Sequence, residues 1–119
     1  MNCPFCEFES VLDAEFVYAR YDKFPVSNGH CLIIPKRHVE TWFDMSKEEQ
    51  QEAFELIDKV KVLLDEKYSP DGYNIGMNCG ETAGQTIPHA HIHVIPRYEG
   101  DMENPRGGVR GVIPEKQNY

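Results

Sequence analysis

Apolar residues recur at helical spacing in one long segment of the chain, residues 46–67, and in short runs elsewhere. Ser46 followed by Glu49 has the spacing of a capping box, which marks the start of a helix. The apolar positions that follow share one helical face, and charged residues occupy the rest. These positions are Ala53, Leu56, Ile57, Val60, Leu63 and Leu64. The segment is therefore predicted to be an amphipathic helix that packs on a sheet and turns its polar face to solvent.

Short apolar runs bounded by turn residues predict strands on both sides of this helix. The expected strands span residues 15–20, 30–35, 73–78 and 87–97. Pro25, Asn28 and Gly29 favour a turn that makes the first two strands a hairpin. Glycine and proline recur after residue 98, so residues 99–119 are expected to form an irregular arm. Strands, one long helix and further strands, in that order, indicate an α+β fold with a mainly antiparallel sheet.

The composition is that of one globular domain over residues 1–119, with 40% hydrophobic and 27% charged residues. A formal net charge of -8 argues against general binding of nucleic acid polymers, which requires a basic face. An anionic ligand would have to be held locally, by histidines, backbone N–H groups or a metal. No apolar run reaches the roughly 18 residues of a membrane span. Met1 leads into polar and cysteine-containing sequence rather than a signal peptide, so we expect a cytoplasmic protein with no membrane partner.

Three of the five histidines, His89, His91 and His93, alternate with apolar residues. In a strand this spacing places all three imidazoles on one face. A single histidine there would be read as a solvated polar position, but three in register indicate chemistry. Metal binding and imidazole chemistry on a phosphate are the two competing functions. The loop Gly84-Gln85-Thr86 favours the phosphate, because its N–H groups, amide and hydroxyl can surround phosphate oxygens.

The four cysteines fall into two kinds. Cys31 and Cys79 lie in strand-like runs, where a free cysteine packs as a small hydrophobic residue. Cys3-Pro-Phe-Cys6 has the spacing that lets both thiolates bind one tetrahedral zinc. In a cytosolic protein such a pair is typical of metal or redox chemistry rather than a structural disulfide. The alternative is a reduced, unliganded pair, since local spacing reveals no second pair of ligands.

The segment Asn74–Arg97, NIGMNCGETAGQTIPHAHIHVIPR, resembles the signature of the histidine triad (HIT) superfamily. The similarity extends upstream through D-x-x-P and G-H-x-L-I-I-P-K-x-H, between Asp22 and His38. The resemblance implies a HIT-like fold: a mainly antiparallel sheet of about five strands, one long helix and a short one, in a two-fold homodimer. The GQT and PR positions, followed by Gly100 and Asp101, are closer to the fragile histidine triad branch of dinucleoside polyphosphate hydrolases than to the phosphoramidase branch.

The same resemblance assigns catalytic roles. His91 would attack the α-phosphorus, with a backbone carbonyl fixing its tautomer. His93 would hydrogen-bond a nonbridging phosphate oxygen, and Asn78 would orient the scissile phosphate. Gln85 and Thr86 would steady the bridging oxygen and the leaving group.

Two further roles follow from the resemblance. Asp22 matches the position that binds the ribose hydroxyls, although an aspartate before Lys23-Phe24-Pro25 also suits a turn. Bacterial members of the family, and the related galactose-1-phosphate uridylyltransferases, complete a CxxC zinc site with two histidines. Here the zinc ligands would be Cys3, Cys6, His38 and His89, with residues 1–8 anchored behind the active-site strand. Four protein ligands would make this zinc structural.

The expected activity is hydrolysis of dinucleoside polyphosphates at the α-phosphate through a nucleotidyl-histidine intermediate. A nucleoside phosphoramidase, or a nucleotidyl transferase or phosphorylase, would use the same chemistry with another leaving group or acceptor. A regulatory nucleotide-binding module belongs to a different class, and a zinc-dependent enzyme would need an open metal position. Arg106 and Arg110 of the arm could approach the anionic substrate or form a solvated basic patch.

Overall fold

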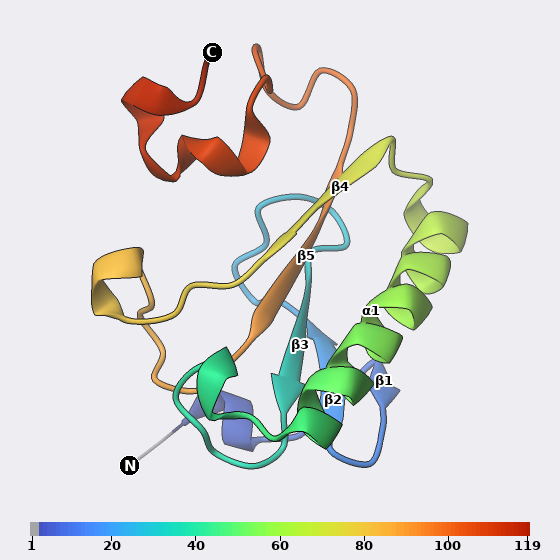
Figure 1. Cartoon of the computed structure of the whole chain (residues 1–119). Coiled ribbons are helices and arrows are strands. Elements are labelled where there is room, and N and C mark those ends of the chain that lie inside the picture. The colour runs from blue at the N-terminus through green and yellow to red at the C-terminus, as the bar shows by residue number, and fades with distance from the viewer. Residues whose placement is uncertain (1–2) are drawn as a thin grey trace.

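A five-stranded antiparallel sheet crossed by one long helix forms the body of the molecule, as the computed structural model shows (Figure 1). The structure describes residues 3–119, so Met1 and Asn2 of the predicted anchoring segment 1–8 lie outside the described residues. The strands are β1 (Leu12–Asp13), β2 (Val17–Tyr21), β3 (Cys31–Pro35), β4 (Gly72–Gly76) and β5 (Ile92–Arg97), in the order β1-β2-β3-β5-β4. The predicted α+β class and antiparallel sheet are confirmed.

The helix α1 (Lys47–Tyr68) begins where the capping box predicted. The Ser46 hydroxyl accepts from the Glu49 N–H at 3.1 Å, and the Glu49 carboxylate accepts from the Ser46 N–H at 2.7 Å. Glu49 is buried, and the guanidinium of Arg37 binds both its oxygens at 2.9 and 3.2 Å, which lowers the pKa of this carboxyl. The other helical pieces of the described chain are 3-10 turns: η1 (Pro4–Cys6), η2 (Trp42–Asp44), η3 (Glu81–Ala83), η4 (Gly108–Val112) and η5 (Pro114–Lys116).

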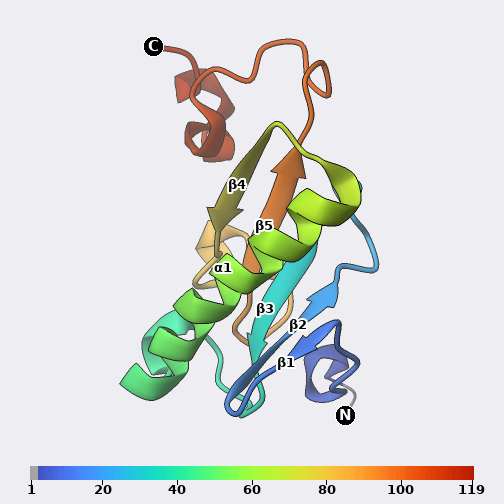
Figure 2. The same cartoon turned by 90° about the vertical axis from the view of Figure 1, so that its right-hand side faces the viewer.

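Both faces of the central strands are buried, which explains their continuous apolar runs. Toward α1, strand residues such as Ala19, Ile33 and Val94 pack with the helix in the main core. On the opposite face, Tyr18, Leu32 and Ile34 pack against Phe5 of η1. Figure 2 shows α1 and the N-terminal turn on opposite sides of the sheet. The short N-terminal turn is therefore a structural part of the domain.

The strand predicted over residues 87–97 begins only at Ile92, and the one predicted over 73–78 ends at Gly76. Pro88 has no N–H for a ladder, and the next N–H, of His89, closes a tight turn on the Ile87 carbonyl at 2.8 Å. The prediction that all three histidines share one strand face is thus wrong. His93 lies in β5, while His89 and His91 precede it.

Beyond β5 the chain forms no further strand or α-helix in the described residues, only η4 and η5 (Figure 1). In the arm, the guanidinium groups of Arg106 and Arg110 lie over the ring of Tyr119, 5.1 and 4.5 Å from its centroid. These cations therefore pack within the arm. Among residues 3–119 there is no helix with the length and apolar character needed to cross a membrane.

Candidate active site and metal centre

A pocket of about 310 Å³ opens on the face of the sheet opposite α1, between the N-terminal turn and the loop that precedes β5. Five residues predicted from the sequence line it: Asp22, Asn78, Thr86, His91 and His93. They come from the end of β2, the segment after β4, the loop before β5 and β5 itself. The fold thus brings together residues that are up to 71 positions apart in the chain.

The His91 ring is fixed by a short contact to its own backbone. Its Nδ1 lies 2.8 Å from the carbonyl oxygen of His89. Because a carbonyl can only accept, Nδ1 carries the proton and Nε2 keeps its lone pair. The ring of Phe5 packs edge-on at 4.8 Å between centroids and restricts its rotation. The nitrogen that remains free keeps the lone pair that a nucleophile needs, and the nucleophilic role of His91 stays a prediction.

His93 has the opposite proton arrangement, which is set by His30. The N–H of Val26 donates to Nδ1 of His30 at 3.0 Å, so His30 must carry its proton on Nε2. That proton is directed to Nδ1 of His93 at 2.9 Å, which places the proton of His93 on Nε2. His93 is therefore a hydrogen-bond donor beside the lone pair of His91, at 5.1 Å between ring centroids.

Burial disfavours the charged form of His93 and of His30. It lowers the pKa of His93 to about 4, with smaller contributions in the same direction from His91 and His30. Burial also lowers the pKa of His30, against the opposing charge of Asp22. Asp22, His30 and His93 lie close enough together to resemble a metal site. Both nitrogens of His30 are already hydrogen-bonded, however, which leaves no lone pair on its ring for a metal.

The loop that precedes β5 is held by Gln85. Its side-chain oxygen accepts from the Gly80 N–H at 2.8 Å, and its amide donates to the carbonyls of Glu40 and Ile87 at 2.7 and 3.0 Å. Both amide hydrogens are thereby used, and Gln85 is not part of the pocket lining. In this geometry Gln85 braces the loop, in contrast to the direct substrate contact expected from the sequence. Thr86 does line the pocket.

Asp22 takes part in a turn and also lines the pocket, where its binding of a ribose stays a prediction. Its Oδ1 accepts from the N–H of Phe24 at 2.9 Å, as in an Asx turn, and its Oδ2 lies 3.5 Å from Nε2 of His30. The same residue lines the pocket together with Phe24 and Leu32. Asp22 is thus fixed by the turn in a position from which it can contact a ligand.

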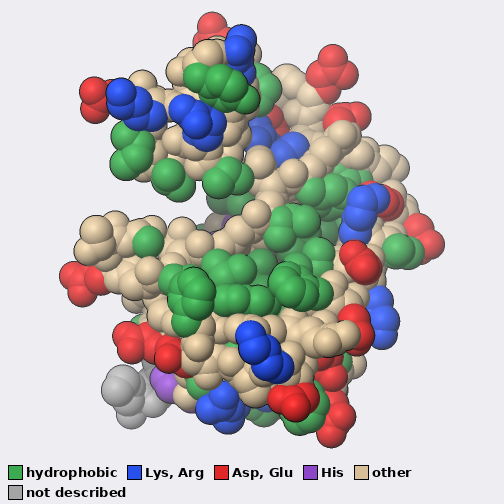
Figure 3. Space-filling model, viewed as in Figure 1, with side chains coloured by type: hydrophobic (Ala, Val, Ile, Leu, Met, Phe, Trp, Pro, Cys, Tyr) green, Lys and Arg blue, Asp and Glu red, His purple; other side chains and the backbone are tan. Residues whose placement is uncertain are grey.

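A second cavity, of about 430 Å³, adjoins the first. Asn78 and His93 line both cavities. The rest of the second cavity is mainly apolar and includes Ile75, Val109 and Val112, so it lies between β4 and the C-terminal arm. Figure 3 shows apolar side chains around the hollow below the arm. The scissile group of a ligand at His93 would have open space on both sides.

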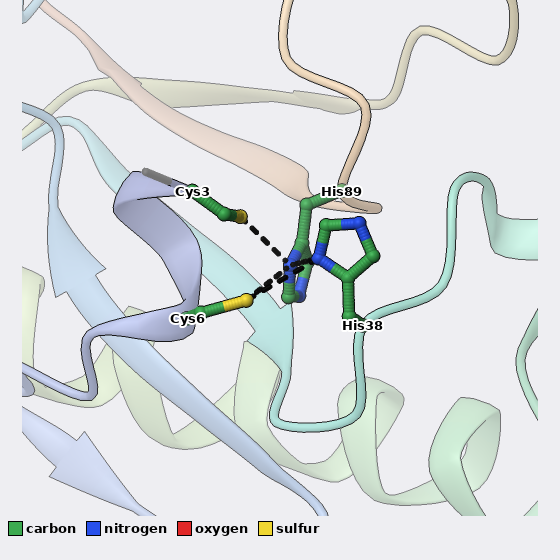
Figure 4. A group of neighbouring side chains, drawn as sticks. All are labelled: Cys3, Cys6, His38 and His89. Atoms are coloured by element: carbon green, nitrogen blue, oxygen red, sulfur yellow. Dashed lines mark hydrogen bonds between the residues drawn. The ribbon is translucent and has the colours of Figure 1, made fainter. Parts of the chain in front are cut away.

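The four predicted zinc ligands lie together behind the pocket, close enough to bind one metal ion (Figure 4). Nδ1 of His89 lies 3.3 Å from the Cys3 sulfur and 3.0 Å from Nδ1 of His38. The Cys6 sulfur lies 3.3 Å from Nδ1 of His38 and 3.6 Å from Nδ1 of His89. Tetrahedral zinc with its usual bond lengths separates such ligand atoms by about 3.3–3.8 Å. These residues therefore fit a Cys₂His₂ zinc site.

The buried ligand His89 is prepared for this role by a second hydrogen bond. Its Nε2 lies 2.7 Å from the carbonyl oxygen of Pro35, so Nε2 carries the proton and Nδ1 presents a lone pair to the metal. Burial lowers the pKa of this imidazole, with partial opposition from the Pro35 carbonyl, so the neutral ligand form is favoured. His89 thus lies in the candidate metal site and does not line the pocket that contains His91.

Reasoning from the sequence missed three residues that shape the site. His30, which lines the second cavity, lies in the G-H-x-L segment, but its pairing with His93 joins positions 63 residues apart. Phe5 stands inside the CxxC spacing and was read only as a spacer between ligands. Arg20 is 4% exposed and lines the pocket while donating to the Pro4 carbonyl at 3.1 Å. The only local indication of this role was the charge of Arg20, which stands in a predicted strand just before a turn.

Residues 7–100 match the HIT domain family, and the chain belongs to this family. An uncharacterised HIT-like protein of Methanocaldococcus jannaschii is 39% identical over 108 residues, which cover 85% of this chain and 83% of that protein. The asymmetrical bis(5'-nucleosyl)-tetraphosphatase of Schizosaccharomyces pombe is 36% identical over 95 residues, 80% of this chain and 50% of that protein. A zinc-bound histidine triad family protein from Mycobacterium smegmatis shares the fold, with a TM-score of 0.72 and 32% identity over 79% of this chain and 68% of that one.

Proposed function

We propose that this protein hydrolyses dinucleoside polyphosphates at the α-phosphate through a nucleotidyl intermediate on His91. The observation that carries the proposal is the pairing of a free imidazole lone pair on His91 with an imidazole donor on His93 in one pocket. The relationship to a bis(5'-nucleosyl)-tetraphosphatase supports the choice of substrate class.

In the first step Nε2 of His91 attacks the α-phosphorus. A P–N bond forms, and the P–O bond to the leaving polyphosphate breaks, so that the leaving group departs as an anion. The N–H of His93 donates to a nonbridging oxygen as negative charge develops there, and the Thr86 hydroxyl donates to a neighbouring oxygen. In the second step water attacks phosphorus, the P–N bond breaks, and a mononucleotide is released.

The nucleoside of the attacked unit would occupy the first pocket. Its walls at Phe5, Phe24 and Leu32 offer apolar surface to a base, and the fixed carboxylate of Asp22 offers an acceptor to the ribose hydroxyls. Asn78, which lines both cavities, would orient the phosphate between them.

The second cavity favours a dinucleoside polyphosphate over a phosphoramidate. A phosphoramidate has a small leaving amine, whereas a cavity of about 430 Å³ next to His93 can hold part of a second nucleoside. Phosphoramidase and transferase activities would use the same attack by His91. They would differ in the leaving group that this cavity holds and in the acceptor that enters from solvent.

We also propose that zinc is bound by Cys3, Cys6, His38 and His89 and that its role is structural. Four protein ligands fill a tetrahedral zinc, so the metal would hold the N-terminal turn and take no part in the phosphate chemistry. Thiolate ligation of this kind requires a reducing compartment, which agrees with the predicted cytoplasmic location.

The test is intact-protein mass spectrometry after mixing with diadenosine tetraphosphate and, separately, with adenosine phosphoramidate, together with product analysis. We expect a transient adduct of one adenylate, faster turnover of the tetraphosphate, and loss of both in His91→Ala. A folded, zinc-loaded wild-type protein that turns over neither compound would instead support a nucleotide-binding module. Loss of turnover on chelation with no change in nucleotide binding would support a zinc-dependent reaction.

A further inference from the structure

The N-terminal turn η1 joins the metal centre to the nucleotide pocket. Cys3 and Cys6 place their sulfurs among the metal ligands, and Figure 4 shows both on the same short turn. Pro4 and Phe5, which lie between them, line the pocket that contains His91. Phe5 is only 5% exposed, and its ring meets the His91 ring at 4.8 Å with an interplanar angle of 63°. One three-residue turn therefore faces both sites.

Phe5 packs on Tyr18, Leu32 and Ile34, but few polar contacts hold the turn in place. A single 3-10 turn is not stable alone, so its position depends on its anchors. The Tyr18 hydroxyl donates to the Phe5 carbonyl at 2.5 Å, and the Arg20 guanidinium donates to the Pro4 carbonyl at 3.1 Å. The two thiols are the remaining polar anchors, one on each side of Phe5. If these thiols were released, the turn would lose its anchors on both sides of Phe5, and the ring would be held less firmly in the pocket wall.

We propose that the metal centre sets the nucleotide affinity of the enzyme by holding Phe5 as a wall of the pocket and against the ring of His91. The inference rests on the proposed function, because it takes the ligand of the pocket to be the nucleoside monophosphate unit. Phe5 is a contact for the nucleoside and a positioning residue for His91. The metal would act on catalysis by holding this turn, and it would not be a reactant.

The first experiment measures the dissociation constant of adenosine monophosphate by calorimetry, with zinc-loaded protein and after chelation, with metal content determined in each sample. Removal of zinc is expected to weaken binding by roughly three- to tenfold, the factor for losing one aromatic contact, and added zinc should restore it. Without any nucleotide, the NMR resonances of the His91 ring should shift on chelation, and zinc-loaded Phe5→Ala should show a shift in the same direction, because the ring current of Phe5 is lost in both. A shift on chelation that Phe5→Ala does not reproduce would reach His91 through His89, whose carbonyl is its hydrogen-bond partner, and would contradict the inference.

Variants that retain the metal test the same link if the chelated protein unfolds. Phe5→Ala should bind zinc normally and lose adenosine monophosphate affinity by a similar factor, with an increase in KM larger than the decrease in kcat. Phe5→Leu, which keeps an apolar wall, should recover part of the affinity. Phe8→Ala is the matched control, because Phe8 is 51% exposed, packs on Tyr18 at 5.4 Å and does not line the pocket.

The outcomes separate this inference from the proposed function. If zinc-loaded Phe5→Ala binds adenosine monophosphate as tightly as wild type, or a folded zinc-free protein keeps both its affinity and its His91 resonances, the inference is wrong while the proposed activity stands. If zinc-loaded wild-type protein neither binds the nucleotide nor forms the adduct, the proposed function fails, and this inference fails with it.

Discussion

Backbone groups determine which nitrogen of each active-site imidazole carries the proton. The His89 carbonyl fixes the proton of His91 on Nδ1, and the Val26 N–H fixes that of His30 on Nε2. The N–H of His30 donates to Nδ1 of His93, which places the proton of His93 on Nε2. Two neighbouring side chains of the same type thereby acquire different functions, one as a lone-pair donor and the other as a hydrogen-bond donor.

Replacing His30 tests this arrangement. In His30→Ala, Nδ1 of His93 loses its donor, so His93 is no longer held in the tautomer that donates from Nε2. We expect kcat for diadenosine tetraphosphate to fall by about ten- to a hundredfold, somewhat less than removing an oxyanion donor outright. Nitrogen NMR of His93 should show a mixture of tautomers in the variant and one tautomer in the wild type. A single unchanged tautomer with reduced kcat would contradict this explanation.

The pKa of His93 predicts a specific loss of stability in acid. An unfolded histidine has a pKa near 6.5, whereas burial lowers the pKa of folded His93 to about 4. Between these values the unfolded chain binds a proton that the folded protein does not, so the free energy of unfolding should decrease as the pH falls from about 6.5 to about 4. Urea unfolding of wild type and His93→Gln at pH 7.5 and pH 5 measures this. Acid weakens metal binding in both proteins, so a steeper decrease in wild type is the effect of His93; equal decreases would contradict it.

At the scale of elements, the sequence predicted what depends on neighbouring residues and missed what depends on distant ones. The start of α1 was predictable because Ser46 and Glu49 cap it through local hydrogen bonds. The start of β5 was not predictable, because the alternation of histidines and apolar residues after Pro88 has the pattern of a strand. The contact of Phe5 with His91 was not predictable either, because it joins residues 86 positions apart.

The turn between β2 and β3 packs against α1 so closely that it requires a glycine. Gly29 has a φ of +90°, and a Cβ atom there would lie 2.9 Å from the Tyr68 ring and 3.2 Å from Leu64 of α1. Gly29→Ala should therefore lower the free energy of unfolding by about 2–4 kcal/mol, from backbone strain and overpacking together. Denaturant unfolding would measure it. Gly72→Ala, whose added Cβ has no neighbour within 4 Å, is the control and should change stability much less.

The two faces of the sheet are covered unequally in the whole molecule. Apolar side chains lie exposed beside the edge strand β4. Tyr73 of β4 hydrogen-bonds Asp65 of α1 at 2.7 Å, so this side of the helix adjoins the strand. Phe54 and Val62 lie on the same side of the helix by helical spacing, and with Ile75 they are between 45% and 59% exposed. Figure 3 shows apolar side chains gathered over the middle of the face that carries α1 and β4.

This surface supports the predicted homodimer. An edge strand offers unpaired N–H and C=O groups, and a two-fold axis beside β4 would pair them and bury the apolar flank of both copies. Light scattering during size exclusion should give twice the chain mass of 13.7 kDa for the wild type. Ile75→Glu and Val62→Glu should shift the mass toward the monomer, because each would bury a carboxylate in the interface. Phe8→Glu adds the same charge at an exposed position on the opposite face of the sheet and should remain dimeric. If all three variants kept the wild-type mass, the interface would have to lie elsewhere, and a monomeric wild type would show that β4 is a true free edge.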